Sequence, residues 1–281
     1  MDNDVSTDFT KTTRQGRKRR RVIGGAVAAA VLVAAAVVGG TLQHSKSGTS
    51  GALGVRACPV IDGTTFLPSI APMPEVDWSK CPLNSATLIG AYLFMAALNS
   101  ADLTNAIMLG ANLTGAKLTS ATMTNASMQG AYLSRADLTN AIMPGAKMQN
   151  ANLYYANLTG ATLTGAYLTS ADFTYATLTS ADLSSANLSS ANLYHANLTG
   201  ANLTGATLTG ATLAYANLTG AKLTGANLTG ATLAFANLTN AVMGGAQILI
   251  GAGNFSTYSN TICPNGQNSN DHLNTCVGQG M

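Results

Sequence analysis

Residues that could carry out acid–base or nucleophilic chemistry are sparse in the central part of this 281-residue chain. Between residues 86 and 248 there is one histidine, His195, and there is no glutamate. The four aspartates of this stretch stand far apart along it, as Asp102, Asp137, Asp172 and Asp182. Catalysis needs an acid, a base or a nucleophile poised beside a partner group, and no such group of residues stands out. We therefore expect no enzyme activity, no cofactor and no metal site.

The four cysteines are the other reactive side chains, and they form two local pairs. Cys58 is close in sequence to Cys81, and Cys263 is close to Cys276. Since all four follow an apolar run that predicts export from the cytoplasm, we expect two disulfides, each contributing about 3 kcal/mol by closing its loop. Zinc binding is the alternative, but the chain has no Cys-X-X-Cys pair, and only His272 lies among the candidate ligands.

Aromatic side chains recur at every twentieth position along part of the sequence. They are Tyr155, Tyr175, Tyr215 and Phe235, and His195 fills the gap; Tyr154 and Tyr194 stand one position earlier. If positions with this spacing lie above one another, these rings form a column that is a candidate binding surface for a sugar or a partner protein. The alternative is that the rings only stack on one another along an edge, with His195 as a stacked ring rather than a catalyst.

The element that must position these residues is a five-residue repeat. From Ala86 to Ala246 every fifth residue is alanine, 33 in succession, and Leu, Met, Phe or Ile stands two places after each. Residues two apart lie on the same face of an extended segment, and the Gly, Asn or Ser that ends most units suits a tight turn. A chain that extends and turns with every unit forms stacked coils, and the aromatic spacing of four units favours four sides. A helical bundle is excluded, because a period of five does not match the 3.6-residue period of a helix.

This A(N/D)LXX pattern resembles that of the pentapeptide repeat family. The resemblance covers residues 86–248 and could begin one unit earlier, at Cys81. It implies an all-β solenoid, a right-handed quadrilateral β-helix of about eight four-sided coils, with the first and third residues of each unit pointing inward. The family also includes acidic rods that mimic DNA and bind DNA gyrase. Because four Lys or Arg balance four Asp in this repeat, we expect neither gyrase nor nucleic acid as a partner.

Residues 1–42 have the features of a membrane anchor. The basic run RKRRR precedes Val22–Leu42, which is uncharged and mostly apolar. This length suits one transmembrane helix of about 20 residues, and the basic run predicts a cytoplasmic tail at 1–21 and an extracytoplasmic C-terminus. One alternative is a signal peptide cleaved near Ala34–Ala36, which would give a secreted protein. Another is that the basic run binds nucleic acid.

The remaining parts flank the repeat. Residues 43–57 are rich in Gly and Ser and predict a flexible linker. Because an open coil exposes core and unpaired backbone, we expect an N-terminal cap at 58–85, with Phe66, Leu67, Ile70 and Trp78 packed on the first coil. The β-helix is placed at 86–250. Residues 251–281 are expected to form a tail, closed by the second disulfide, that covers the end of the last coil.

Together these features predict a protein of a bacterial cell envelope, anchored in the cell membrane by residues 22–42 or secreted after signal cleavage. The main hypothesis is a non-catalytic extracytoplasmic scaffold or protein-binding module. The alternative is a lectin-like protein that binds carbohydrate through the aromatic residues. Expected partners are the membrane, an envelope protein or glycan, and further copies of the chain through the coil ends. The threonine-rich faces also resemble the ice-binding face of some β-helical antifreeze proteins, although threonine suits strands in any case.

Overall fold

The computed structural model describes residues 58–68 and 71–248 and, near the C-terminus, residues 261, 263, 265 and 267–269. The expected cytoplasmic tail, transmembrane helix and linker lie outside the described residues, as does most of the expected C-terminal tail. Within the described part of the chain, no helix has the length and apolar character needed to cross a membrane.

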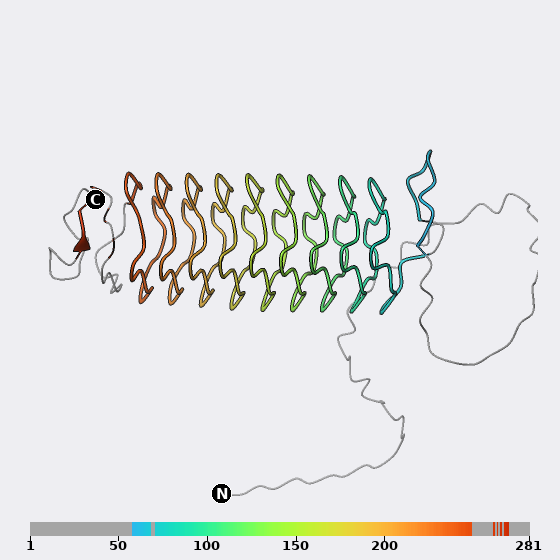
Figure 1. Ribbon diagram of the computed structural model, residues 1–281, viewed down its shortest axis with the longest axis horizontal. Helices are drawn as coiled ribbons and strands as arrows, with labels where there is room; N and C mark the ends of the chain where they lie inside the picture. The colour runs from blue at the N-terminus through green and yellow to red at the C-terminus, as the bar shows by residue number, and fades with distance from the viewer. Residues whose placement is uncertain are drawn as a thin grey trace, which may run out of the picture. The chain divides into compact units, whose positions relative to one another are not determined.

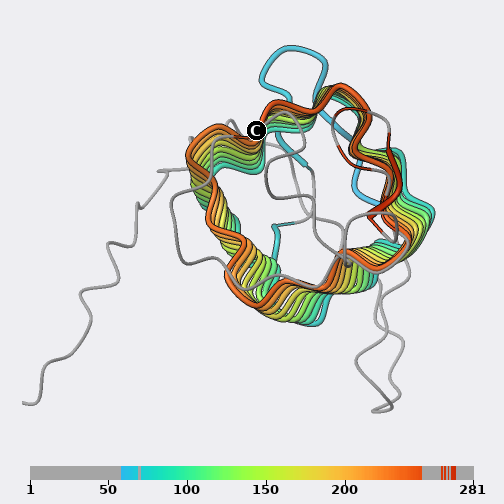
Figure 2. The same ribbon diagram turned by 90° about the vertical axis from the view of Figure 1, so that its left-hand side faces the viewer.

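Residues 76–248 wind into a stack of four-sided coils (Figures 1 and 2). The second residue of each unit forms an isolated parallel bridge with the second residue of the unit four units later, from Asp77–Ala97 to Asn227–Gln247. No side of a coil is therefore a continuous strand. Residues 76–235 make eight coils of four units each, and residues 236–248 begin a ninth. This confirms the prediction of a quadrilateral β-helix.

The four sides of the coils are named here by the first residue of their units. Face 1 holds the units that begin at 76, 96 and every fourth unit after that, and faces 2, 3 and 4 begin at 81, 86 and 91. Coil 1 is residues 76–95, and coil 8 is residues 216–235. The five positions of a unit are numbered 1 to 5.

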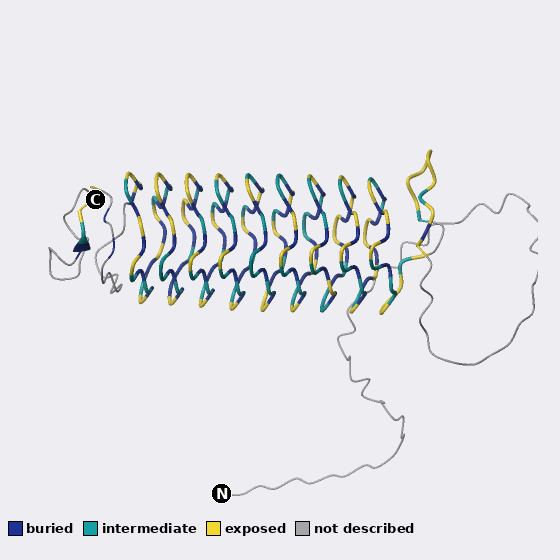
Figure 3. Cartoon of the chain, viewed as in Figure 1, coloured by how far each residue is buried: buried dark blue, intermediate teal, exposed yellow. Residues whose placement is uncertain are grey.

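Positions 1 and 3 build the core. From Ala86 to Ile248 every residue at these positions is at most 6% exposed, and buried and exposed residues alternate along each coil (Figure 3). Burying each leucine contributes on the order of 2 kcal/mol, so the stack is held mainly by a continuous column of Ala and Leu or Met on each face.

Backbone hydrogen bonds account for the residue types at the outward positions. In unit 111–115, the N–H groups of positions 2, 3 and 5 donate to carbonyls of the neighbouring coils, and the N–H of position 1 closes the preceding turn. The remaining N–H, at Thr114, donates to the side chain of Asn112 over 3.1 Å. Asn or Asp at position 2 thus satisfies the one backbone donor that the coil itself leaves free.

Position 5 turns the chain in the left-handed region, with φ between 55° and 69° from Lys80 to Gly245. Glycine adopts this conformation without strain. At Gly145 glycine also has a local reason, because a Cβ there would lie 2.5 Å from the Oδ1 atom of Asn125 in the preceding coil.

The coil geometry begins at Val76, two units before the alanine series, and not at the expected boundary between 85 and 86. Trp78 and Cys81 take the inward positions of the first two units and are 0% and 2% exposed. Pro82 occupies position 2 at this open edge, where no preceding coil could accept an N–H bond, and proline has no N–H to leave unpaired.

The cap covers coil 1 through its backbone rather than through the apolar side chains that were expected to do so. Phe66 and Leu67 are 45% and 43% exposed, whereas the carbonyl of Phe66 accepts the N–H of Thr87 over 2.6 Å. The antiparallel bridge Ile61–Pro68 shapes this segment. Of the other residues expected to pack there, Trp78 is buried as part of coil 1, and Ile70 lies outside the described residues.

At the C-terminal end, the hydroxyl of Thr261 donates to the carbonyl of Leu238 in the last, incomplete coil. Cys263 is fully buried and disulfide-bonded, while its expected partner Cys276 lies outside the described residues. Described residues of the tail therefore contact the end of the coil stack.

Candidate binding surface

Five rings lie above one another along the corner where face 4 turns into face 1. Successive ring centroids are 4.9 to 5.0 Å apart and the ring planes are within 8° to 17° of parallel, for Tyr155–Tyr175, Tyr175–His195, His195–Tyr215 and Tyr215–Phe235. This spacing matches the distance of about 4.8 Å between neighbouring strands. The coil itself therefore brings side chains four units apart to stacking distance. We call these five residues the aromatic column.

Two further tyrosines, at position 4, pack their edges against the column. Tyr154 lies 4.5 Å from the Tyr155 ring at 85°, and Tyr194 lies 4.4 Å from the His195 ring at 88°. Desolvation and the neighbouring Tyr155 phenol raise the pKa of Tyr154. Tyr154 therefore stays a neutral hydrogen-bonding group over a wider alkaline range.

Each ring of the column stands on a residue with a strained backbone. The φ values are 57° at Tyr155, 59° at Tyr175, 55° at His195, and 59° at Tyr215 and Phe235. For a residue with a Cβ this conformation costs roughly 1–2 kcal/mol, which glycine at the same position would avoid. A favourable aromatic pair contributes about 0.5–1.5 kcal/mol beyond its buried area, so two stacked neighbours offset this cost.

The column exposes ring edges rather than ring faces. As whole residues, Tyr155, Tyr175 and Tyr215 are 48%, 38% and 44% exposed. Their faces point at neighbouring rings about 5 Å away, which leaves no room for a further ring between them. Apart from the outer faces of the end rings, Tyr155 and Phe235, a ligand must therefore approach the edges of the rings from the side.

A family model described as pentapeptide repeats matches the chain with eight copies between residues 96 and 245, which is more than half of its length. The chain belongs to the pentapeptide repeat family. Its coils are those of a right-handed quadrilateral β-helix, the fold of pentapeptide repeat proteins.

Solved pentapeptide repeat structures are similar to this chain. HetL, a pentapeptide repeat protein involved in heterocyst differentiation regulation from the cyanobacterium Nostoc sp. strain PCC 7120, is 32% identical over 71% of this chain and 88% of its own, with a TM-score of 0.35. QnrB1, a plasmid-mediated fluoroquinolone resistance protein, is 24% identical over 50% of this chain and 73% of its own, with a TM-score of 0.45. None of the curated proteins compared with the chain matches it significantly.

The aspartates of the pentapeptide repeats act as caps of the backbone. Asp182 accepts hydrogen bonds from the Ser184 N–H, the Thr164 hydroxyl and the Asn202 amide, each over 3.0 Å. Burial alone would raise the pKa of Asp182, but these bonds outweigh it and lower the pKa below 3.8. Asp137 shows the same pattern. In the described part of the chain, no group of three or more His, Cys, Asp or Glu is placed to hold a metal ion.

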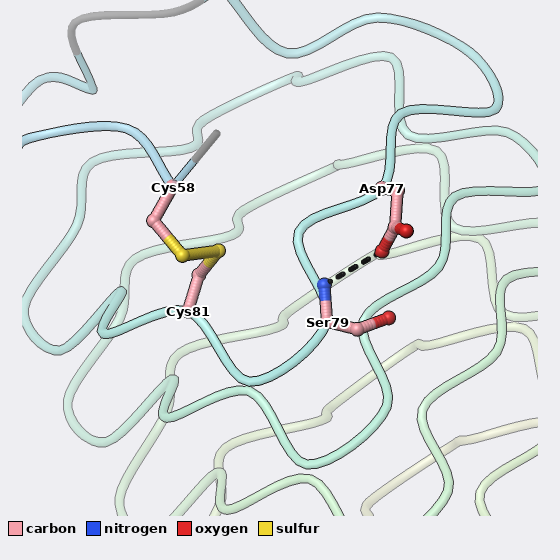
Figure 4. The surroundings of a disulfide bond; sticks show 4 residues. All are labelled: Cys58, Asp77, Ser79 and Cys81. Atoms are coloured by element: carbon pink, nitrogen blue, oxygen red, sulfur yellow. Dashed lines mark hydrogen bonds between the residues drawn. A yellow bond between two sulfur atoms is a disulfide. The ribbon is translucent and has the colours of Figure 1, made fainter. Parts of the chain in front are cut away.

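Cys58 and Cys81 form a disulfide with an S–S distance of 2.05 Å and a Cα–Cα distance of 5.2 Å (Figure 4). Cys81 stands at position 1 of a pentapeptide unit, so this bond ties the cap to the first coil. Beside it, Asp77 accepts the N–H of Ser79 over 3.1 Å, as the Asn and Asp residues of later units do.

Sequence reasoning missed two features of these pentapeptide repeats. The first is the capping role of Asn and Asp at position 2, for which their frequency was the signal. The second is the unit 76–80, which precedes the earliest start that the resemblance allowed, at Cys81. Trp78 and Leu83 stand two units and one unit before Leu88, so the spacing of large apolar residues already indicated two more units.

Proposed function

We propose that this pentapeptide repeat protein is a non-catalytic binding rod that recognises a partner protein along the aromatic column, and that residues 22–42 hold it outside the cell membrane. The aromatic column carries the first part of the proposal. It is an exposed, preordered row of rings on a repeat body without net charge. Tyrosine is enriched at binding hot spots, and side chains already fixed by stacking lose little entropy on binding.

The geometry supports a protein partner better than a carbohydrate. A sugar ring packs its C–H groups on an open aromatic face, whereas the inner rings of the column turn their faces to one another. Ring edges and phenol hydroxyls suit the mixed apolar and hydrogen-bonding side chains of a protein surface.

Two sequence features support the extracytoplasmic placement. Residues 22–42 are long and apolar enough to span a bilayer, with basic residues on the N-terminal side. The Cys58–Cys81 disulfide belongs to a part of the chain that would then lie in an oxidising compartment. Protease treatment of intact cells tests the placement, because added protease should reach the repeat body only if that body lies outside the cytoplasm.

Photo-crosslinking tests the binding role. Benzoylphenylalanine at position 175 should form adducts with a partner protein, while the same residue at position 167 on face 3 should not; Tyr167 is 48% exposed but outside the column. The triple variant Tyr155→Ser, Tyr175→Ser, Tyr215→Ser should lose the partner, since serine occupies the same turn position at Ser180. Equal adducts at both positions, or binding to a glycan array that the triple variant abolishes, would contradict a protein-binding column.

A further inference from the structure

A second exposed surface lies on faces 3 and 4 of the first two coils, away from the aromatic column. Its side chains are large and apolar and stand at outward positions: Ile89, Tyr92, Phe94, Met95, Ile107 and Leu109. Ile89 is 59% exposed and Tyr92 is 50% exposed, although most units carry Asn or Thr at these positions. We call these six residues the corner patch.

The register of the coils makes the corner patch continuous. Ile89 and Leu109 occupy the same position in successive coils, whose backbones are about 4.8 Å apart. Ile107 stands two positions before Leu109 on the same face. Across the corner, the rings of Tyr92 and Phe94 are stacked with centroids 6.2 Å apart.

In the coils next to the corner patch, basic residues stand on the same two faces as the patch, and the aspartates stand on the other two faces. Further along the same two faces, coils 3 and 4 carry Arg135 and Lys147 and no acidic residue. The aspartates of the first four coils, Asp77, Asp102 and Asp137, all stand on faces 1 and 2. Glu75, beside Phe94, and Asp62, in the cap segment whose Phe66 carbonyl accepts the N–H of Thr87, lie at the N-terminal end of the patch. The arginine and the lysine therefore lie on the other side of the patch, further along the coils.

We infer that faces 3 and 4 of the first four coils lie against the lipid bilayer, with the corner patch in the interfacial layer and Arg135 and Lys147 at anionic headgroups. An apolar surface with tyrosine and flanking Lys or Arg is the composition of interfacial membrane binding. A contiguous set of large apolar side chains, separate from the aromatic column, on a repeat body without net charge marks an interaction surface.

The membrane anchor of the proposed function, on which this step rests, would hold the corner patch near a lipid bilayer. Residues 43–57 separate the expected transmembrane helix from Cys58, and a linker of this length reaches at most about 50 Å. Coil 1 follows directly after the cap, so the corner patch is in the part of the coil stack nearest the anchor along the chain. A weak surface contact is sufficient under such tethering, because the local concentration of bilayer is high.

The test uses the full chain in vesicles of phosphatidylcholine and phosphatidylglycerol at 7:3 that contain a diazirine-labelled lipid. Carbene adducts are mapped by mass spectrometry. The patch variant is Ile89→Thr, Ile107→Asn, Leu109→Thr, which installs the common residue of each position and therefore preserves the coil. The control variant is Ile142→Asn with Val242→Asn on face 2, where the side chains are 43% and 36% exposed.

Within the repeat body, residues 76–248, adducts should concentrate on residues 86–110 and fall at least about fivefold in the patch variant but not in the control. Adducts on residues 22–42 report the anchor and are counted separately. Omitting phosphatidylglycerol should also reduce them. Equal labelling of patch variant and control, or labelling centred on face 2, would overturn the inference. Carbonate extraction separates the two proposals: if the chain is released from the vesicles, the anchor fails, and flotation in low salt then tests the corner patch by itself.

Discussion

The substitution Tyr175→Gly tests the balance between two energies in the aromatic column, the stacking of the rings and the strain of the left-handed backbone that carries them. It removes two stacked contacts, to Tyr155 at 4.9 Å and to His195 at 5.0 Å, and two edge contacts to Tyr154 and Tyr194 at 6.1 and 6.2 Å. At roughly 1 kcal/mol for a stacked pair and about half that for an edge pair, the loss is about 3 kcal/mol. Relief of the left-handed backbone returns roughly 1–2 kcal/mol, less the added entropy of glycine in the unfolded chain, about 0.5–1 kcal/mol. We expect a net destabilisation of about 2 kcal/mol.

The matched control is Ser180→Gly, because Ser180 has the same left-handed turn, with φ 56°, on face 1 and no stacked ring. There only the backbone terms remain, so we expect a change within about 1 kcal/mol on the stabilising side. The difference between the two substitutions measures the stacking.

Hydrogen exchange is the suitable assay, since long repeat arrays open locally and need not unfold as one unit. The N–H of residue 175 donates to the carbonyl of Tyr194 over 3.0 Å, and the N–H of residue 180 donates to that of Thr199 over 2.9 Å. A loss of about 2 kcal/mol corresponds to exchange about 30-fold faster around residue 175. If Tyr175→Gly slows exchange as the control should, the rings do not stabilise the coil and the energetic argument for the column is wrong.

Four further predictions concern the rest of the fold. Leu203→Ala, at a fully buried position, should cost about 2–4 kcal/mol, seen as faster exchange in the coils on either side. Asn197→Ala should cost about 1 kcal/mol in denaturant unfolding, because the N–H two residues later loses its acceptor at 3.1 Å. The lowered pKa of Asp182 means that its stabilisation is present above pH 3.8 and is lost as the pH falls; Asp182→Asn should therefore flatten this acid-side loss in pH-dependent melting. Cys58→Ser should release the cap from the first coil at a cost of about 3 kcal/mol, measured as faster hydrogen exchange in residues 58–68. Unchanged exchange there would show that the disulfide does not hold the cap.

The fold was predictable because its constraints repeat at every turn. Position 1 must be small and position 3 large and apolar in each unit, so the five-residue period recurs in 33 successive units. The aromatic residues, spaced by twenty, indicate that four units make one coil. The start of the repeat was placed too late because the residue types of the first two units differ: Cys81 takes the place of alanine, and Trp78 takes that of leucine. The apolar spacing persists there, but a search for alanine does not find it.

The candidate site was predictable only in part. Spacing places the five side chains of the column above one another, but it does not fix the orientation of the rings, which depends on side-chain rotamers over a left-handed backbone. That orientation decides whether faces or edges are offered to a ligand. The cap was misread for a related reason, since its contact with coil 1 is made by the carbonyl of Phe66, and the identity of a side chain does not report backbone hydrogen bonds.

Since positions 1 and 3 are committed to the core, function in this coil stack can be encoded only at positions 2, 4 and 5. Many units carry an Asn or Asp at position 2 that caps their own backbone, and most carry Gly, Ser or Asn at the turn. Large apolar or aromatic departures from this usage cluster in two places, the corner patch in coils 1 and 2 and the aromatic column from coil 4 to coil 8, while Tyr132, Ile142, Tyr167 and Val242 stand outside both. Each departure replaces a residue that stabilises the local backbone with one that does not. Examples are tyrosine at a turn with φ 59° and isoleucine at a position where asparagine would cap an N–H. The corner patch ends in coil 2, and four of the five rings of the aromatic column lie in coils 5 to 8. A bilayer held at the early coils therefore leaves those four rings free, at a fixed number of coils from the patch.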